Sequence, residues 1–66
     1  MEITANGKQL DITAGSSLRA LLDALGMDPA RVAVEHNRQI VPRDRLAATL
    51  LAAGDRVEIV QFVGGG

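Results

Sequence analysis

The stretch "MEITANGKQLDITAGSSLRALLDALG" (Met1–Gly26) decides the fold, because it contains a β-hairpin followed directly by an amphipathic helix. Met1–Ala5 places apolar side chains on one face of a short strand, and Lys8–Thr13 alternates in the same way. Between these strands stands Asn6–Gly7, a pair that tolerates the positive φ angles of a two-residue hairpin turn. The sequence therefore predicts an antiparallel hairpin with one apolar face.

A stripe of leucines predicts the helix that covers this hairpin. The four leucines recur at i, i+3, i+4 and i+7, and they are Leu18, Leu21, Leu22 and Leu25. This spacing gives one continuous apolar face on an α-helix. Ala14–Ser17 ends the strand and supplies hydroxyl groups as helix N-caps, and Gly26 suits a left-handed C-terminal cap. We expect the helix to lie across the hairpin with all four leucines in the core.

The second half of the chain predicts strands that return to the same sheet. Arg31–His36 alternates, Ile40–Val41 is a short extended pair, and Arg56–Val63 is the last strand. Within the ambiguous segment 43–53 we expect one helical turn at Asp44–Ala47 and a loop after it. Because a helix crossover brings a late strand back parallel to the first, we predict an α+β roll. Its mixed sheet has four to five strands, with one main helix across one face.

Composition excludes several classes of function. The chain has no cysteine, so it has no disulfide, no thiol nucleophile and no cysteine-based metal site. A net charge of −1 argues against a nucleic-acid partner, which favours a basic face. The longest apolar stretch, Leu46–Ala53, is too short to span a bilayer, and the first ten residues do not resemble a signal peptide. We therefore expect a soluble cytoplasmic protein, monomeric or weakly associating.

The side chains predict neither a catalytic residue nor a metal site. His36, the single histidine, has no second histidine and no acid at a ligand spacing, so we expect it to face solvent. No serine–histidine–aspartate set stands out, and the final glycines lack the strand–loop–helix context of a phosphate loop. We therefore predict that the chain is not an enzyme.

A group of arginines near Asp44 allows two interpretations. Arg38, Arg43 and Arg45 form either a solvated loop with internal ion pairs or a contact surface for a partner enzyme.

The chain ends on "QFVGGG" (Gln61–Gly66). Its three glycines are either a terminal segment without a function or the functional end of the protein. We divide the chain into one domain, 1–63, and a flexible tail, 64–66. Glycine has no Cβ, so a narrow channel admits it closely. The α-carboxyl group of Gly66, with a reference pKa of about 3.5, is an inert carboxylate at neutral pH. It becomes reactive only after a partner converts it to a species such as an acyl-adenylate.

If the glycine tail is functional, we expect a partner-docking patch on the folded surface next to it in the sequence. Ordering each residue costs roughly 1–2 kcal/mol, so a folded surface must offset the cost of fixing three glycines. In the last strand Val57 and Ile59 alternate inward, which leaves Val60 and Phe62 outward on the helix-free face. These two form the predicted partner-docking patch. The alternative is a bulge that turns Phe62 back into the core.

Together these motifs resemble the ThiS family, the small sulfur carriers of thiamine thiazole biosynthesis. The resemblance lies in "VAVEHNRQIVPR" (Val32–Arg43), in "AGDRVEIVQFV" (Ala53–Val63), in the helix entry and in the terminal Gly65–Gly66. It covers essentially the whole chain, although the family requires only the final glycine pair rather than three. It implies the β-grasp, or ubiquitin-like, fold.

The resemblance also implies a reaction cycle. An adenylating enzyme of the ubiquitin-activating type (ThiF-like) would use ATP and Mg to activate Gly66, and the chain itself would bind no cofactor. A donor such as a cysteine desulfurase would supply sulfur, which makes a C-terminal thiocarboxylate for a ThiG-like thiazole synthase. The residues that enter the partner active sites would be Gly64, Gly65 and Gly66. Two alternatives stay open: a sulfur carrier for molybdopterin or another pathway, and a non-covalent docking module that uses Val60 and Phe62.

Overall fold

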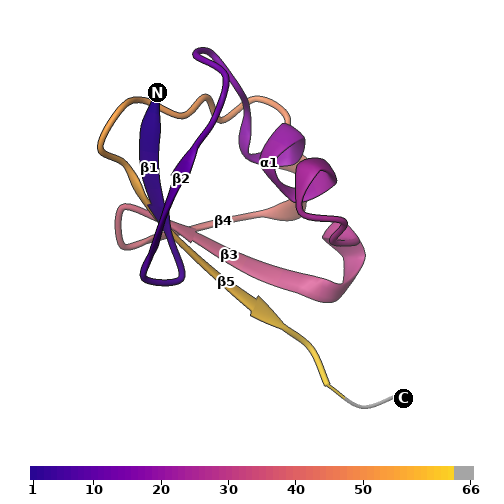
Figure 1. The fold of residues 1–66 in the computed structure, drawn as a ribbon. Coiled ribbons are helices and arrows are strands. Elements are labelled where there is room, and N and C mark those ends of the chain that lie inside the picture. Colours follow the sequence, from indigo (N-terminus) through magenta and orange to yellow (C-terminus); the bar gives the residue numbers. More distant parts are fainter. Residues whose placement is uncertain (64–66) are drawn as a thin grey trace.

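The computed structural model describes residues 1–63, which form a five-stranded sheet and one α-helix (Figure 1). The elements are β1 (Glu2–Ala5), β2 (Lys8–Asp11), α1 (Leu18–Ala24), η1 (Pro29–Arg31), β3 (Val32–His36), β4 (Gln39–Val41), η2 (Arg43–Arg45) and β5 (Arg56–Gln61). The strand order is β2-β1-β5-β3-β4, in which β5 runs parallel to β1 and antiparallel to β3. The predicted α+β roll with a mixed sheet is confirmed.

The first hairpin forms as the sequence predicts. Asn6 and Gly7 have φ angles of 49° and 80°, which are the left-handed values that a tight turn between twisted strands requires. Asn6 has a second role, because its side chain bridges to the last strand. Its Oδ1 accepts a hydrogen bond from the Ile59 N–H at 2.7 Å, and its Nδ2 donates to the Ile59 carbonyl at 3.1 Å. This amide therefore extends the contact between β1 and β5 beyond the last paired residue, Ala5.

Helix α1 packs on one face of the sheet and closes the core. The Ser17 side chain caps its first turn by accepting a hydrogen bond from the Ala20 N–H at 3.0 Å. Gly26 follows the helix with a φ of 71°, which confirms the predicted left-handed cap. The buried cluster consists of Ile3, Leu18, Leu21, Leu22, Val32, Val34, Leu46, Leu51, Val57 and Ile59.

One leucine of the stripe is not in the core. Leu25 is 40% exposed, so the prediction of four buried leucines is wrong at this position. The helix ends at Ala24, and Leu25 lies beyond it, beside the edge strand β2. There it lines an open recess with Leu10 and Met27, because no further element within residues 1–63 covers that edge.

The segment that the sequence left ambiguous contributes to the core instead. Leu46 and Leu51 are 2% and 4% exposed. The segment is held to the start of α1 by hydrogen bonds from the Leu18 N–H to the Thr49 carbonyl and from the Leu51 N–H to the Ser16 carbonyl. This irregular stretch therefore covers the end of the core that the short helix leaves open.

Several predicted boundaries were wrong: β1, β3 and β4 begin one residue away from the predicted positions, and three other differences are larger. The second strand ends at Asp11 rather than Thr13, and the helical turn is the 3-10 turn η2 rather than Asp44–Ala47. The last strand ends at Gln61, because its partner β3 begins at Val32, the residue paired with Gln61. Among residues 1–63 there is no helix with the length and apolar character that crossing a membrane requires.

Candidate functional site

Strand β5 occupies the middle of the sheet and leads towards the C-terminal glycines. Val57 and Ile59 are 0% and 7% exposed, whereas Val60 and Phe62 are 61% and 62% exposed. The predicted inward and outward alternation is confirmed, and the alternative of a bulge that buries Phe62 is wrong. After the strand, the Phe62 N–H still donates to the Arg31 carbonyl at 2.8 Å. The backbone is therefore anchored to the sheet as far as Phe62.

The two outward side chains lie in different surroundings. Val60 is paired with Ala33 and lies beside Ile40 on the helix-free face of the sheet. Phe62 lines a separate recess of about 250 Å³ with Pro29 and Arg43, where η1 and η2 approach the end of β5. The structure thus exposes both predicted docking residues but does not bring them into one recess.

The structure decides only one of the two interpretations of the arginine group. Within residues 1–63, no ion pair involves Asp44 or any of Arg38, Arg43 and Arg45, so the internal pairing that one interpretation expected is absent. Of the three arginines, the one that shares a recess with Phe62 is Arg43. A role in partner contact stays a prediction for all three.

His36 does not face solvent, and the prediction that it does was wrong. Its Nε2 lies 2.7 Å from Oδ2 of Asp55, and the two side chains are only 19% and 14% exposed. The Asn37 Nδ2 donates to Oδ1 of Asp55 at 3.1 Å, and the Ala52 N–H donates to Oδ2 at 2.8 Å. Asp55 therefore ties the end of β3 to the loop that precedes β5.

The environment of Asp55 lowers the pKa of its carboxyl group below the ordinary value of 3.8. Desolvation is the largest single influence and would raise the pKa. It is outweighed by the hydrogen bonds from His36, Ala52 and Asn37 and by the charge of His36. The carboxylate is thus ionised at neutral pH and acts as an acceptor that orders the loop.

Sequence reasoning missed this network because its members are 18 to 19 positions apart. They meet because the β3–β5 register pairs His36 with Val57, which places Asp55 just beyond the strand end. The one signal available was the "GD" that precedes the last strand. No cluster of three potential metal-ligating side chains occurs in the described part of the chain.

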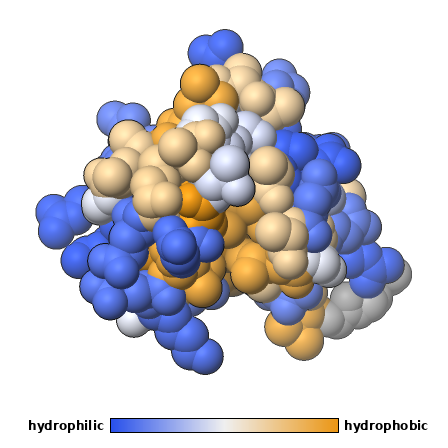
Figure 2. Space-filling view, turned by 45° about the horizontal axis from the view of Figure 1, so that its top comes forward, coloured by the Kyte–Doolittle hydropathy of each residue, from blue (hydrophilic) through white to orange (hydrophobic). Residues whose placement is uncertain are grey.

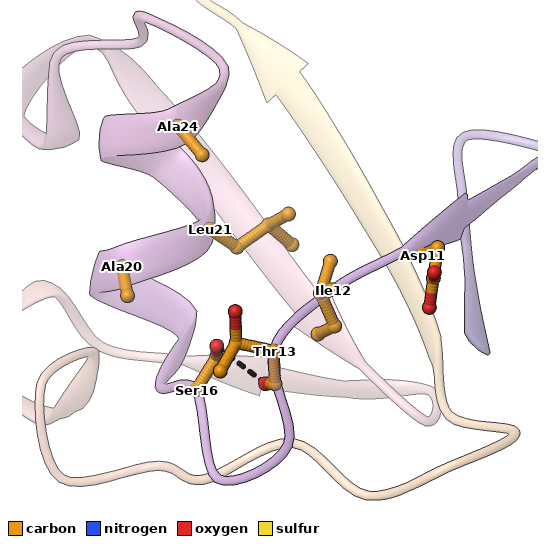
Figure 3. Close-up of a pocket in the computed structure, with 7 residues that line it drawn as sticks. All are labelled: Asp11, Ile12, Thr13, Ser16, Ala20, Leu21 and Ala24. Carbon is orange, nitrogen blue, oxygen red and sulfur yellow. Dashed lines mark hydrogen bonds between the residues drawn. The ribbon is translucent and has the colours of Figure 1, made fainter. Parts of the chain in front are cut away.

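A recess beside α1 is lined by both polar and apolar side chains. Its volume is about 340 Å³, and it opens between α1 and the segment after β2 (Figure 3). Leu21 points towards Ile12 across it, and the Ser16 hydroxyl donates to the Thr13 carbonyl at 2.6 Å. This hydroxyl therefore has a structural partner in the backbone of the preceding segment.

Apolar surface is not confined to the end of β5. On the face shown in Figure 2, apolar residues line a hollow in the middle, with hydrophilic residues on either side. Exposure of an apolar side chain is therefore not sufficient to identify a docking site on this molecule. The proposed tail residues Gly64, Gly65 and Gly66 lie outside the described residues.

Comparison with known proteins places the whole chain in one family. The ThiS family matches residues 1–66. The chain is 42% identical to a thiazole synthase of Paramagnetospirillum magneticum over 66 residues, which are all of this chain and 20% of that protein. It thus spans about a fifth of the length of such relatives. It is 33% identical to the sulfur carrier protein ThiS of Escherichia coli, and the match covers both chains completely.

A solved structure agrees with these matches. The crystal structure of a thiamine biosynthesis protein (ThiS) from Geobacter metallireducens superimposes with a TM-score of 0.85, at 35% identity and full coverage of both chains. The fold and the sequence thus lead to the same family, and this chain belongs to the ThiS family, with the β-grasp fold.

Proposed function

We propose that this chain is a sulfur carrier of thiamine thiazole biosynthesis and that its reactive group is the carboxyl group of Gly66. The observation that carries the proposal is the full-length match to the sulfur carrier protein ThiS of Escherichia coli. The solved structure of a thiamine biosynthesis protein (ThiS) from Geobacter metallireducens, which superimposes over the whole chain with a TM-score of 0.85, supports it as well. We infer a non-enzymatic carrier on which partner enzymes act.

The chemistry follows from the inertness of a carboxylate. The Gly66 carboxylate attacks the α-phosphorus of ATP, pyrophosphate leaves, and an acyl-adenylate forms. A sulfur nucleophile then attacks the carbonyl carbon, a C–S bond forms, and AMP leaves with the oxygen it shared with that carbon. When the nucleophile is a persulfide, a second thiol must cleave the S–S bond to release the thiocarboxylate. Mg²⁺ with ATP would belong to the adenylating enzyme.

The domain contributes presentation and recognition. Strand β5 is paired on both sides, and the Asn6 amide and the Arg31 carbonyl hold its last part in place. We propose that Val60 and Phe62, exposed beside the tail, contact the partners that receive it. A rigid base of this kind limits the conformational entropy lost on docking to that of the glycines.

The partners have unequal support. A thiazole synthase partner is supported by the two thiazole synthases that contain a segment 42% identical to this whole chain. The ThiF-like adenylating enzyme and the cysteine desulfurase follow from the chemistry and from the family resemblance. We propose that the cycle takes place in the cytoplasm.

Intact-mass spectrometry tests the proposal. The 66-residue chain is incubated with a ThiF-like enzyme, ATP, Mg²⁺ and a sulfur donor, and one oxygen of the chain should be replaced by sulfur. Omission of ATP is the control and should leave the mass unchanged. An unchanged mass under conditions that convert the Escherichia coli carrier would contradict the proposal.

The exposed Val60 and Phe62 favour a second candidate, a docking module that never uses its terminus. Addition of one alanine after Gly66 separates the two functions. The carrier loses sulfur transfer, because the activated carboxyl group is displaced from its place in the partner site. The docking module keeps its full function. A carrier that serves molybdopterin would instead convert normally but fail to support thiazole synthesis.

A further inference from the structure

The helix-free face of the sheet carries exposed apolar residues from three strands. Val60 on β5 is paired with Ala33 on β3, and Ile40 on β4 is paired with Glu35 on β3. Val60 is 61% exposed and Ile40 is 79% exposed. No described part of the chain covers these side chains.

Two carboxylates lie within this apolar group. Glu35 and Glu58 are direct partners across β3 and β5, on the face opposite the buried Val34 and Ile59. Like charges directly opposite each other on one sheet face destabilise the strand pair. Within residues 1–63 neither carboxylate forms an ion pair, although Arg56 stands two positions before Glu58 on the same strand. Among the described residues, the face thus presents two paired carboxylates that form no ion pair.

The carboxylates border a shallow recess of about 90 Å³, lined also by Ile40 and Val60. This volume is below the roughly 300–1,000 Å³ of small-molecule pockets, and it suits the end of one side chain. A long basic side chain has an apolar stem and a charged head. Its stem would contact Ile40 and Val60, and its head would lie between Glu35 and Glu58.

We propose that this face docks the thiazole synthase partner and that an arginine or lysine of the synthase sits between Glu35 and Glu58. The inference rests on the proposed function. The synthase is the expected occupant because synthases of two organisms contain a segment similar to this whole chain, so that carrier and synthase segments occur in one polypeptide. Val60 belongs both to this face and to the proposed docking patch, which makes the two surfaces continuous.

Binding of the chain to a separately purified thiazole synthase tests the docking proposal. The double variant E35Q/E58Q should bind at least about tenfold more weakly at low ionic strength, because it loses charge-assisted hydrogen bonds. The affinity of the parent chain should fall as salt is added, and that of the variant should change little. Asp23→Asn removes an exposed carboxylate on α1, away from this face, and should bind as the parent does. Thermal unfolding should find E35Q/E58Q at least as stable as the parent, because the repulsion between strands is gone.

Each outcome decides the proposal. Equal affinity of E35Q/E58Q and the parent chain overturns it, as does failure of the parent to bind the synthase. Weaker binding confined to the adenylating enzyme assigns the face to that enzyme and also overturns it. The mass assay with the parent chain separates this result from failure of the proposed function. If the parent chain acquires sulfur and the E35Q/E58Q variant binds the synthase with unchanged affinity, the docking proposal is contradicted and the proposed function is not.

Discussion

At the residue scale, Asp55 is a polar side chain on which two segments of the fold depend. It accepts hydrogen bonds from His36, Asn37 and the Ala52 N–H while it is largely buried. A charge-assisted hydrogen bond contributes about 1.5–3 kcal/mol, which is a large fraction of the stability of a small domain. We expect Asp55→Asn to lower the free energy of unfolding at neutral pH by about 1–3 kcal/mol, measured by urea unfolding.

The same substitution should change the pH dependence of stability. The pKa of Asp55 is lower in the folded chain than the ordinary value of 3.8 that applies in the unfolded chain. At a pH between these two pKa values, the unfolded state binds more protons than the folded state. The stability that the Asp55 carboxylate contributes is therefore complete above the unfolded pKa and is lost as pH falls through the folded pKa. The parent should therefore lose more stability than Asp55→Asn between about pH 5 and pH 2. Parallel stability curves would contradict this role.

Arg38 adopts a backbone conformation that suits glycine better. Its φ is 72° in the turn between β3 and β4, where Asn37 also has a positive φ of 48°. A left-handed conformation costs a residue with a Cβ roughly 1–2 kcal/mol. Substitution by glycine removes this cost, but the larger conformational entropy of glycine in the unfolded state offsets part of the gain in stability. We expect Arg38→Gly to raise the free energy of unfolding by up to about 1 kcal/mol. The control Gln39→Gly, in a strand, should lower it, and a loss in both variants would disprove the account of strain.

At the element scale, the position of β5 depends on a side chain from the first turn. Asn6→Gly keeps the freedom of the turn but removes both hydrogen bonds to Ile59. We expect it to lower stability by about 1–2 kcal/mol. Amide hydrogen exchange, measured by NMR, should accelerate at Ile59 because its N–H loses the acceptor. Unchanged protection at Ile59 would show that β5 does not need this bridge.

We expect the segment 43–53 to stabilise the fold through its two buried leucines, Leu46 and Leu51, more than through its exposed residues. Leu46 is 2% exposed and Leu50 is 63% exposed, although both are leucines of the same irregular stretch. Leu46→Ala should cost about 2–5 kcal/mol, as buried leucine truncations do, and Leu50→Ala should cost less than about 0.5 kcal/mol. Chemical denaturation of both variants checks this, and similar losses would mean that the segment does not close the core.

At the scale of the whole molecule, local patterns predicted the hairpin and the helix, because each depends on residues close in sequence. The parallel pairing of β1 with β5 joins distant residues, and it was predicted from the general rule that a helix crossover returns the chain parallel to its first strand. The ends of strands depended on distant partners, as at Gln61, where β3 begins opposite. Leu25 was expected in the core because helical periodicity does not show where the sheet ends. The His36–Asp55 pair was invisible for the same reason: it exists only through the register of β3 and β5.

The candidate site divides in a similar way. The exposure of Val60 and Phe62 was predictable from strand alternation, whereas their separation into two recesses required the positions of η1 and η2. Glu35 pairs with Glu58, which is 23 positions later in the sequence. A local sequence pattern could not predict this pairing either. Chemistry at Gly66 was inferred from the terminal glycines and the family resemblance.

The central claim is that sulfur is carried on the carbonyl carbon of Gly66. Its most direct test is tandem mass spectrometry of the chain after reaction with adenylating enzyme, ATP, Mg²⁺ and labelled sulfur donor. The account predicts that the label occurs only in fragments that contain Gly66 and disappears from them once thiazole synthase and its other substrates are added. Label on any residue of 1–63, or an unlabelled Gly66 in a reaction that still makes thiazole, would contradict it.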